Sequence, residues 1–302
     1  MPHSRKPLDT FLEDTLLGAL QPEAAAMARH LAARFGDETE AVLYYGSCLR
    51  TGAIEGLIMD FYVLLGSYGR AYERKWLAFL NRLLPPNVFY VETKWDGKML
   101  CAKVAVMTAR DFRKRCAPGR FNASLWARFS QPARLAWFKS AEARKETAAG
   151  VRDAVLAMAG NVLPFFEDEP APEALWVKAL KLTYGAEFRS ERADKAEELY
   201  RLNRSYFERL TPLVLAELGT TPPAAARAAK AAWARRRLMG KAASLLRLLK
   251  AGLTFSGGMD YLAWKVERSS GVKVALKPWH RRYPLLAAPV LFFRLRRKGA
   301  FR

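Results

Sequence analysis

The segment that most constrains the fold is AVLYYGSCLRTGAIEGLIMDFYVLL, residues 41–65, in which two short apolar runs flank a Gly-Ser dipeptide. Residues 41–46 and 57–65 have the length and the aromatic and β-branched content of buried strands. The stretch between them has room for a turn and a short helix that begins at Ser47. One acid, Asp60, interrupts the second run. The segment therefore predicts strand, turn, helix and strand, with a carboxylate on the second strand.

Helices and a hairpin complete the predicted N-terminal part of the chain. Two helices over residues 9–35 precede these strands, the second with Pro22 in its first turn. Residues 72–84 have helical spacing and end at two prolines. The runs NVFYVET and KMLCAKVAVMT flank Asp96-Gly97, a favourable hairpin turn. The predicted fold class is therefore α+β, with a small mixed or antiparallel sheet backed by helices.

From about residue 108 onward the pattern is almost wholly helical. Trp126, Trp137 and Trp176 occupy helical positions that suit packing. We therefore predict three parts: an α/β unit over residues 1–140, a mostly helical unit over 141–267 and a basic tail over 268–302.

The charge of the chain indicates an anionic partner. Its 302 residues include 50 Lys and Arg against 29 Asp and Glu, a formal net charge of +21. Nucleic acid and an anionic membrane surface both fit such an excess. Three cysteines and three histidines, with no CxxC pair, indicate neither a zinc site nor a disulfide framework. The N-terminal residues lack the apolar core of a signal peptide, and the longest apolar stretch, residues 283–293, is too short to span a bilayer.

The Gly46-Ser47 turn and Asp60 together suit phosphate chemistry. Glycine lets a phosphate approach the backbone, the serine hydroxyl donates a hydrogen bond, and N–H groups at a helix start point at the anion. A carboxylate on the adjacent strand can hold Mg²⁺ that bridges the same phosphates. This is the layout of the polymerase-β-like nucleotidyltransferases, except that Tyr62 stands where their usual second acid would be. The alternative is structural: an ordinary turn, followed by an acid at the solvent-facing end or edge of a strand.

Further sequence blocks follow this motif in order: KVAVMTARDF, WARFSQPARL, KLTYGAEFRSERADKAEEL and GKAASLLRLLKAGLTFSGGMDYLAWKV. Together with YYGSCLR and LIMDFYVLL they resemble the mitochondrial-type phosphatidate cytidylyltransferases, the peripheral CDP-diacylglycerol synthases that also occur in bacteria. The resemblance spans about residues 40–265. In that family the acid is likewise followed by Phe and apolar residues, so Tyr62 is no departure from it. The resemblance implies a nucleotidyltransferase-like domain within residues 1–140 and a helical domain that completes the site.

The resemblance also implies Mg²⁺-dependent transfer of CMP from CTP to phosphatidic acid, which gives CDP-diacylglycerol and pyrophosphate for phospholipid biosynthesis. Asp60 would hold Mg²⁺ and act in catalysis, with Lys103 and Arg128 as phosphate cations. The residues implied to bind the nucleotide or the lipid head group are Gly46, Ser47, Tyr184, Glu187, Arg189 and Lys195. Two positions depart from the family. Gln131 replaces a lysine, whose loss would either weaken catalysis or shift its role to Arg134, and Glu187 replaces an aspartate.

These residues also have structural interpretations. Arg189 and Lys195 lie in a charge-rich stretch that ordinarily forms a solvated helix face, and Tyr184 suits a core position. Glu55 and Glu92 are both candidates for a second metal ligand, and the pattern gives no preference between them.

The C-terminal third is strongly basic. No acid occurs from residue 218 to 259, and the tail places an apolar stretch between two cationic clusters. This is the pattern of an interfacial membrane anchor. The residues expected to contact the membrane are Trp279, Arg281, Arg282, Phe292, Phe293, Arg294, Arg296 and Arg297. A nucleic-acid tail and a segment packed on the body are the alternatives, and the apolar stretch favours the membrane.

The leading hypothesis is thus a phosphatidate cytidylyltransferase that is peripheral on the cytoplasmic face of the membrane, with CTP, phosphatidic acid and Mg²⁺ as its ligands. Two alternatives stay open. One is a nucleotidyltransferase that acts on RNA or on a small substrate. The other is a catalytically inactive membrane-bound relative.

Overall fold

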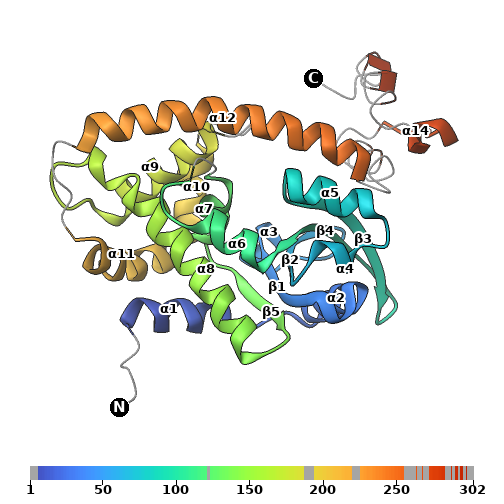
Figure 1. Cartoon of the computed structure of the whole chain (residues 1–302), viewed down its shortest axis with the longest axis horizontal. Coiled ribbons are helices and arrows are strands. Elements are labelled where there is room, and N and C mark those ends of the chain that lie inside the picture. The colour runs from blue at the N-terminus through green and yellow to red at the C-terminus, as the bar shows by residue number, and fades with distance from the viewer. Residues whose placement is uncertain are drawn as a thin grey trace.

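The computed structural model is an α+β protein in which a five-stranded mixed sheet is covered by helices, with a helical C-terminal region (Figure 1). The predicted fold class is therefore confirmed. The structure describes residues 6–120, 123–186, 194–219, 225–254 and 272–282, together with the single positions 263, 267, 287, 290, 291, 293, 294 and 297.

The sheet has the strand order β3-β4-β2-β1-β5. Its strands are β1 (Thr39–Tyr45), β2 (Ile58–Leu65), β3 (Asn87–Trp95), β4 (Lys98–Thr108) and β5 (Arg134–Phe138). β2 and β4 are parallel, whereas the other three pairs are antiparallel. The strand that carries Asp60 is therefore the central strand, so the interpretation of this acid as part of a sheet edge is wrong.

The helices follow the predicted pattern closely. They are α1 (Pro7–Leu16), α2 (Pro22–Phe35), α3 (Ser47–Thr51), α4 (Tyr68–Ala71), α5 (Lys75–Leu83), α6 (Ala109–Cys116), α7 (Ser124–Phe129), α8 (Ala141–Gly160), α9 (Pro172–Gly185), α10 (Lys195–Leu202), α11 (Arg204–Leu218), α12 (Ala225–Thr254) and α14 (Pro278–Arg282). The predicted turn at Asp96-Gly97 joins β3 to β4, with Asp96 at a φ of 47°. Among the described residues, no helix has both the length and the apolar character needed to cross a bilayer.

The prediction of an almost wholly helical chain after residue 108 is wrong at one place. Residues 134–138 form β5, which pairs with β1, and Trp137 lies opposite Val42 on this strand instead of on a helix. Five residues are too few to show a strand period against a helical background. They become a strand because β1 would otherwise leave its backbone N–H and C=O groups unpaired along that edge.

Helices cover both faces of the sheet. Side chains alternate between faces along a strand, so Thr93 of β3 lies on the face opposite Asp60, and its hydroxyl contacts His30 of α2 at 3.4 Å. On the face of the sheet that carries Asp60, α7 covers the C-terminal half of β2, where Tyr62 packs edge-on against Phe129 of α7. This double coverage explains why β2 is buried from Phe61 to Leu65.

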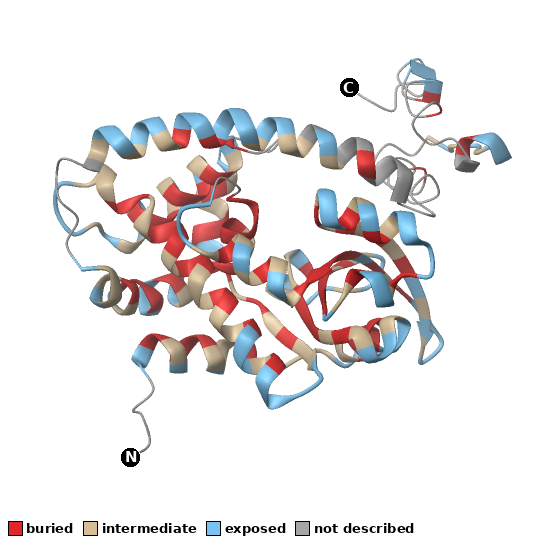
Figure 2. Cartoon of the chain, viewed as in Figure 1, coloured by how far each residue is buried: buried red, intermediate tan, exposed pale blue. Residues whose placement is uncertain are grey.

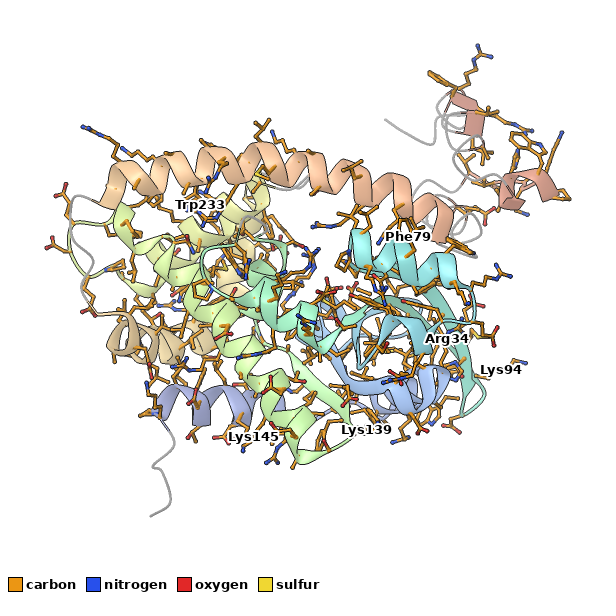
Figure 3. The ribbon with its side chains drawn as sticks, viewed as in Figure 1. Arg34, Phe79, Lys94, Lys139, Lys145 and Trp233 are labelled. Atoms are coloured by element: carbon orange, nitrogen blue, oxygen red, sulfur yellow. The ribbon has the colours of Figure 1, made fainter. Side chains whose placement is uncertain are left out.

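One continuous cluster of buried side chains joins the sheet to the helical region (Figure 2). Trp126 and Trp176 are fully buried in it, which confirms their predicted packing role. Trp233 points from α12 into the same body (Figure 3), and its indole N–H donates to the Asn161 carbonyl at 2.8 Å. The boundaries at residues 140 and 267 stay a prediction.

Candidate functional site

The Gly46 turn and the Asp60 carboxylate lie directly against each other. Tyr45, the last residue of β1, is the register partner of Asp60 on β2. Gly46 follows with a φ of 93°, and a Cβ atom at this position would lie 2.7 Å from Asp60 Oδ2. A real Cβ does not approach an oxygen this closely, so only glycine permits the contact. The sequence prediction that these two groups share a site is therefore consistent with the geometry.

A polar row crosses four strands at this level. Asp60 has Tyr45 on one side and Lys103 on the other, and Lys103 in turn has Tyr90 as its partner on β3. Register partners project to the same face, with Cβ atoms about 5 Å apart. Lys103 is exposed, whereas the other three are partly buried. The row thus presents a carboxylate, an ammonium and two phenols on the face away from α2.

Arg128 reaches the same row from α7. Its guanidinium donates to the Ser124 carbonyl at 2.6 Å, which holds it along its own helix. Burial and the Asp60 carboxylate raise the pKa of the Tyr45 phenol well above its usual range, and Arg128 opposes this shift by its charge and by a hydrogen bond to the phenol. Arg128 therefore lies one side chain away from Asp60, as a phosphate cation would.

Arg50 is a candidate site residue that the sequence pattern did not indicate. It lies on α3, one turn after Gly46, and burial lowers the pKa of its guanidinium. Four groups oppose the shift and so lie within electrostatic range: Tyr184 of α9, Asp60, Glu198 of α10 and Cys48 of α3 itself. The Arg50 Nε is buried and has no hydrogen-bond partner among the described residues. An anionic ligand that accepted from this nitrogen would satisfy it.

The helical region contributes part of the predicted set. Tyr184 is within electrostatic range of Arg50 and packs partly buried against the main core, which agrees with its core interpretation, while its role in ligand binding stays a prediction. Lys195 donates to Glu198 at 2.8 Å, and Glu198 in turn is close enough to Arg50 for that cation to lower its pKa. Glu187 and Arg189 lie outside the described residues.

Gln131, at the position where the resembled family has a lysine, is buried and uncharged, so it does not supply a phosphate cation. Its amide donates to the Ala127 carbonyl, and its oxygen has no partner in the described part of the chain. Arg134, the predicted substitute, lies on the face opposite Asp60, since it is the register partner of Tyr44. Its guanidinium donates to the Thr15 carbonyl at 2.8 Å. The idea that Arg134 takes over a phosphate role is therefore wrong, and Arg50 is the better placed cation.

The donor set at this site fits Mg²⁺ held jointly with a substrate. No group of three or more His, Cys, Asp or Glu side chains within the described ranges is arranged to hold a metal. Mg²⁺ needs fewer, because it usually binds through one or two carboxylates plus substrate phosphates and waters. Asp60 would supply one carboxylate. Glu92 lies on the same face, two strands away across β4 and offset by two residues along the strands, at a backbone separation of roughly 12 Å, and Glu55 is exposed before β2.

The predicted membrane residues are described in part. Trp279 is 38% exposed and Phe293 62% exposed, and Arg294 and Arg297 are also exposed. Phe292 and Arg296 lie outside the described residues, as do the side chains of Arg281 and Arg282. Part of the apolar stretch is not free for a membrane: Ala287 and Leu291 are buried in a small cluster with Val272, Val274 and Leu276.

Comparison with known proteins finds no matching family model and no matching curated protein. The family resemblance therefore depends on the sequence blocks quoted above.

Proposed function

We propose that the protein is a phosphatidate cytidylyltransferase, which transfers CMP from CTP to phosphatidic acid and releases pyrophosphate. One observation carries the proposal: the Asp60 carboxylate of the central strand occupies the space beside Gly46 that a Cβ would need, 2.7 Å from that position, at a strand–turn–helix junction. This arrangement supports a triphosphate and a metal carboxylate in the same place. The ordered sequence blocks supply the choice of CTP and of the lipid substrate.

The reaction needs positioning and charge neutralisation more than covalent chemistry by the protein. A phosphate oxygen of phosphatidic acid attacks the α-phosphorus of CTP, the new P–O bond forms, and the bond to the β-phosphate oxygen breaks to release pyrophosphate. Mg²⁺ held by Asp60 would neutralise charge on the phosphates. Gly46 leaves the backbone open to the triphosphate, and the Ser47 hydroxyl would donate to it.

Cations from three elements would share the remaining negative charge. Arg50 of α3 and Arg128 of α7 lie near Asp60 and Tyr45, and Lys103 is the strand neighbour of Asp60. Arginine suits this role because its planar fork matches phosphate oxygens. The lipid phosphate and the triphosphate are both anionic, so cations on several sides of one carboxylate lower the repulsion between the two substrates.

The test is product formation from CTP, Mg²⁺ and vesicles that contain phosphatidic acid. We expect CDP-diacylglycerol from the wild type, none from Asp60→Ala, and wild-type activity from Asp168→Ala, which removes an exposed acid before α9. CMP addition to RNA without lipid would select the RNA nucleotidyltransferase instead. Vesicle binding without any product would identify a catalytically inactive relative.

A further inference from the structure

Helix α5 exposes large apolar side chains that an ordinary surface helix would bury. Toward the protein it buries Ala78 and Asn81, and the Asn81 amide donates to the Tyr72 hydroxyl and the Val106 carbonyl, both at 2.9 Å. Leu77 and Leu80 are partly buried, but three other large apolar side chains of the helix are exposed to solvent. Amphipathic surface helices normally bury such side chains, so this helix presents an apolar face that its own fold does not use.

The exposed face is a narrow stripe of three residues. Trp76, Phe79 and Leu83 are 43%, 65% and 70% exposed. Their spacing of three and four residues places them in one row along the helix. Figure 3 labels Phe79 on α5. We call these three residues the α5 face.

Cations border the α5 face. Arg74, Lys75 and Arg82 are all exposed and lie at its start and along one side. Helix α12 passes close to the end of α5, because the Lys250 ammonium donates to the Pro86 carbonyl at 2.6 Å. One turn before Lys250, Leu246 is 55% exposed, and further along α12 Leu238 is 76% exposed among exposed arginines and lysines.

We propose that the α5 face inserts into the head-group region of an anionic bilayer and forms a membrane contact separate from the C-terminal tail. Aromatic and aliphatic side chains bordered by Arg and Lys are the composition of helices that lie in the membrane interface. Each cation near an anionic surface adds to the attraction. The proposal deepens the proposed function by placing the lipid surface on α5, but it is measured by binding and not by catalysis.

A second copy of the chain is a poorer occupant. In a two-fold contact through the α5 face, Lys75 and Arg82 would approach the same residues of the other copy. Each chain also carries a net charge of +21, so two copies repel each other and are both attracted to an anionic surface.

The test uses the full chain and vesicles of phosphatidylcholine with and without phosphatidylglycerol. Phe79→Glu/Leu83→Glu should bind the anionic vesicles at least tenfold more weakly than the wild type. The matched control is Leu17→Glu/Leu202→Glu, which adds the same charge at two other exposed leucines, 45% and 54% exposed. This control should bind like the wild type, and thermal unfolding should show that both variants remain folded.

A second measurement does not depend on acidic substitutions. Brominated lipid should quench part of the tryptophan fluorescence of the wild type. The part of this quenching that comes from Trp76 should be absent in Trp76→Phe, while quenching of Trp279 should be unchanged. Unchanged binding by the glutamate variant together with unchanged quenching in Trp76→Phe would overturn the proposal. The proposal would also be overturned if the wild type were a dimer, and the two glutamate substitutions made it a monomer without any loss of vesicle binding. A catalytically inactive protein that still showed both effects would refute the proposed activity and leave the α5 face in place.

Discussion

Replacing Gly46 by alanine should separate the structural cost of this turn from its role at the site. Gly46 has φ 93° and ψ −162°, a backbone region that is essentially restricted to glycine. Forcing another residue into such a region costs about 1–3 kcal/mol. The new Cβ would also lie 2.7 Å from Asp60 Oδ2 and 3.2 Å from Asp60 Cβ, so the carboxylate must move away from the turn.

Gly219→Ala is the matched control. Gly219 has φ 66° and ψ −168° at the end of α11, close to the conformation of Gly46, and a Cβ there meets no atom within 4 Å in the described part of the chain. Both variants should therefore lose a similar free energy of unfolding, about 1–3 kcal/mol from the backbone alone. Only Gly46→Ala displaces a site residue.

The assay pairs urea unfolding with calorimetric binding of CTP in the presence of Mg²⁺. Gly46→Ala should bind CTP at least roughly tenfold more weakly than the wild type, because misplacing a metal ligand costs at least as much as losing a group that orients one. Gly219→Ala should bind like the wild type. If Gly46→Ala binds CTP as tightly as Gly219→Ala, the contact between this turn and Asp60 has no role in nucleotide binding.

Two other substitutions test charges that the fold places in partly buried positions. Arg50→Ala should weaken CTP binding with little loss of stability, because the buried Arg50 Nε lacks a partner among the described residues. Arg50→Lys should recover only part of the CTP binding. A large fall in the unfolding free energy of Arg50→Ala with unchanged CTP affinity would show that Arg50 has a structural role instead. Burial lowers the pKa of Lys250 to about 7, whereas the unfolded side chain titrates near 10.5. The unfolded chain therefore binds more protons between pH 7 and 10, so the wild type should gain stability relative to Lys250→Met as the pH rises through that window. Urea unfolding at pH 7 and 9.5 measures this gain, and a constant difference between the two proteins would contradict it.

Local sequence patterns were sufficient to predict most of the strands and the central residues of the candidate site. The apolar runs at 41–46 and 57–65 become β1 and β2, and the hairpin turn lies where Asp96-Gly97 predicts it. The closeness of Gly46 and Asp60 follows from the same short segment, because β1 and β2 are sequential antiparallel strands and pair the end of one with the start of the other. Lys103 joins them through the parallel pairing of β2 with β4.

Features that depend on distant pairing were beyond the sequence pattern. β5 is a strand only because β1 offers it an edge, across a separation of about ninety residues. Arg50 is a site candidate only because the fold brings Tyr184 of α9 and Glu198 of α10 within its electrostatic range, and nothing in the run SCLRT marks it. The α5 face could not be predicted for a related reason. Helical spacing predicts the helix but not which side is buried, and the hydrogen bonds of Asn81 to Tyr72 and to β4 hold the Asn81 side toward the protein.

The proposed function requires that Asp60 holds Mg²⁺ beside a triphosphate at the Gly46 turn. Titrating CTP into the wild type and into Asp60→Asn, each with Mg²⁺ and with EDTA, tests it most directly. We expect wild-type binding to weaken at least roughly tenfold when Mg²⁺ is removed, and Asp60→Asn to bind with the weaker affinity in both conditions. Tight CTP binding by Asp60→Asn that still requires Mg²⁺ would contradict the claim, because another residue would then hold the metal.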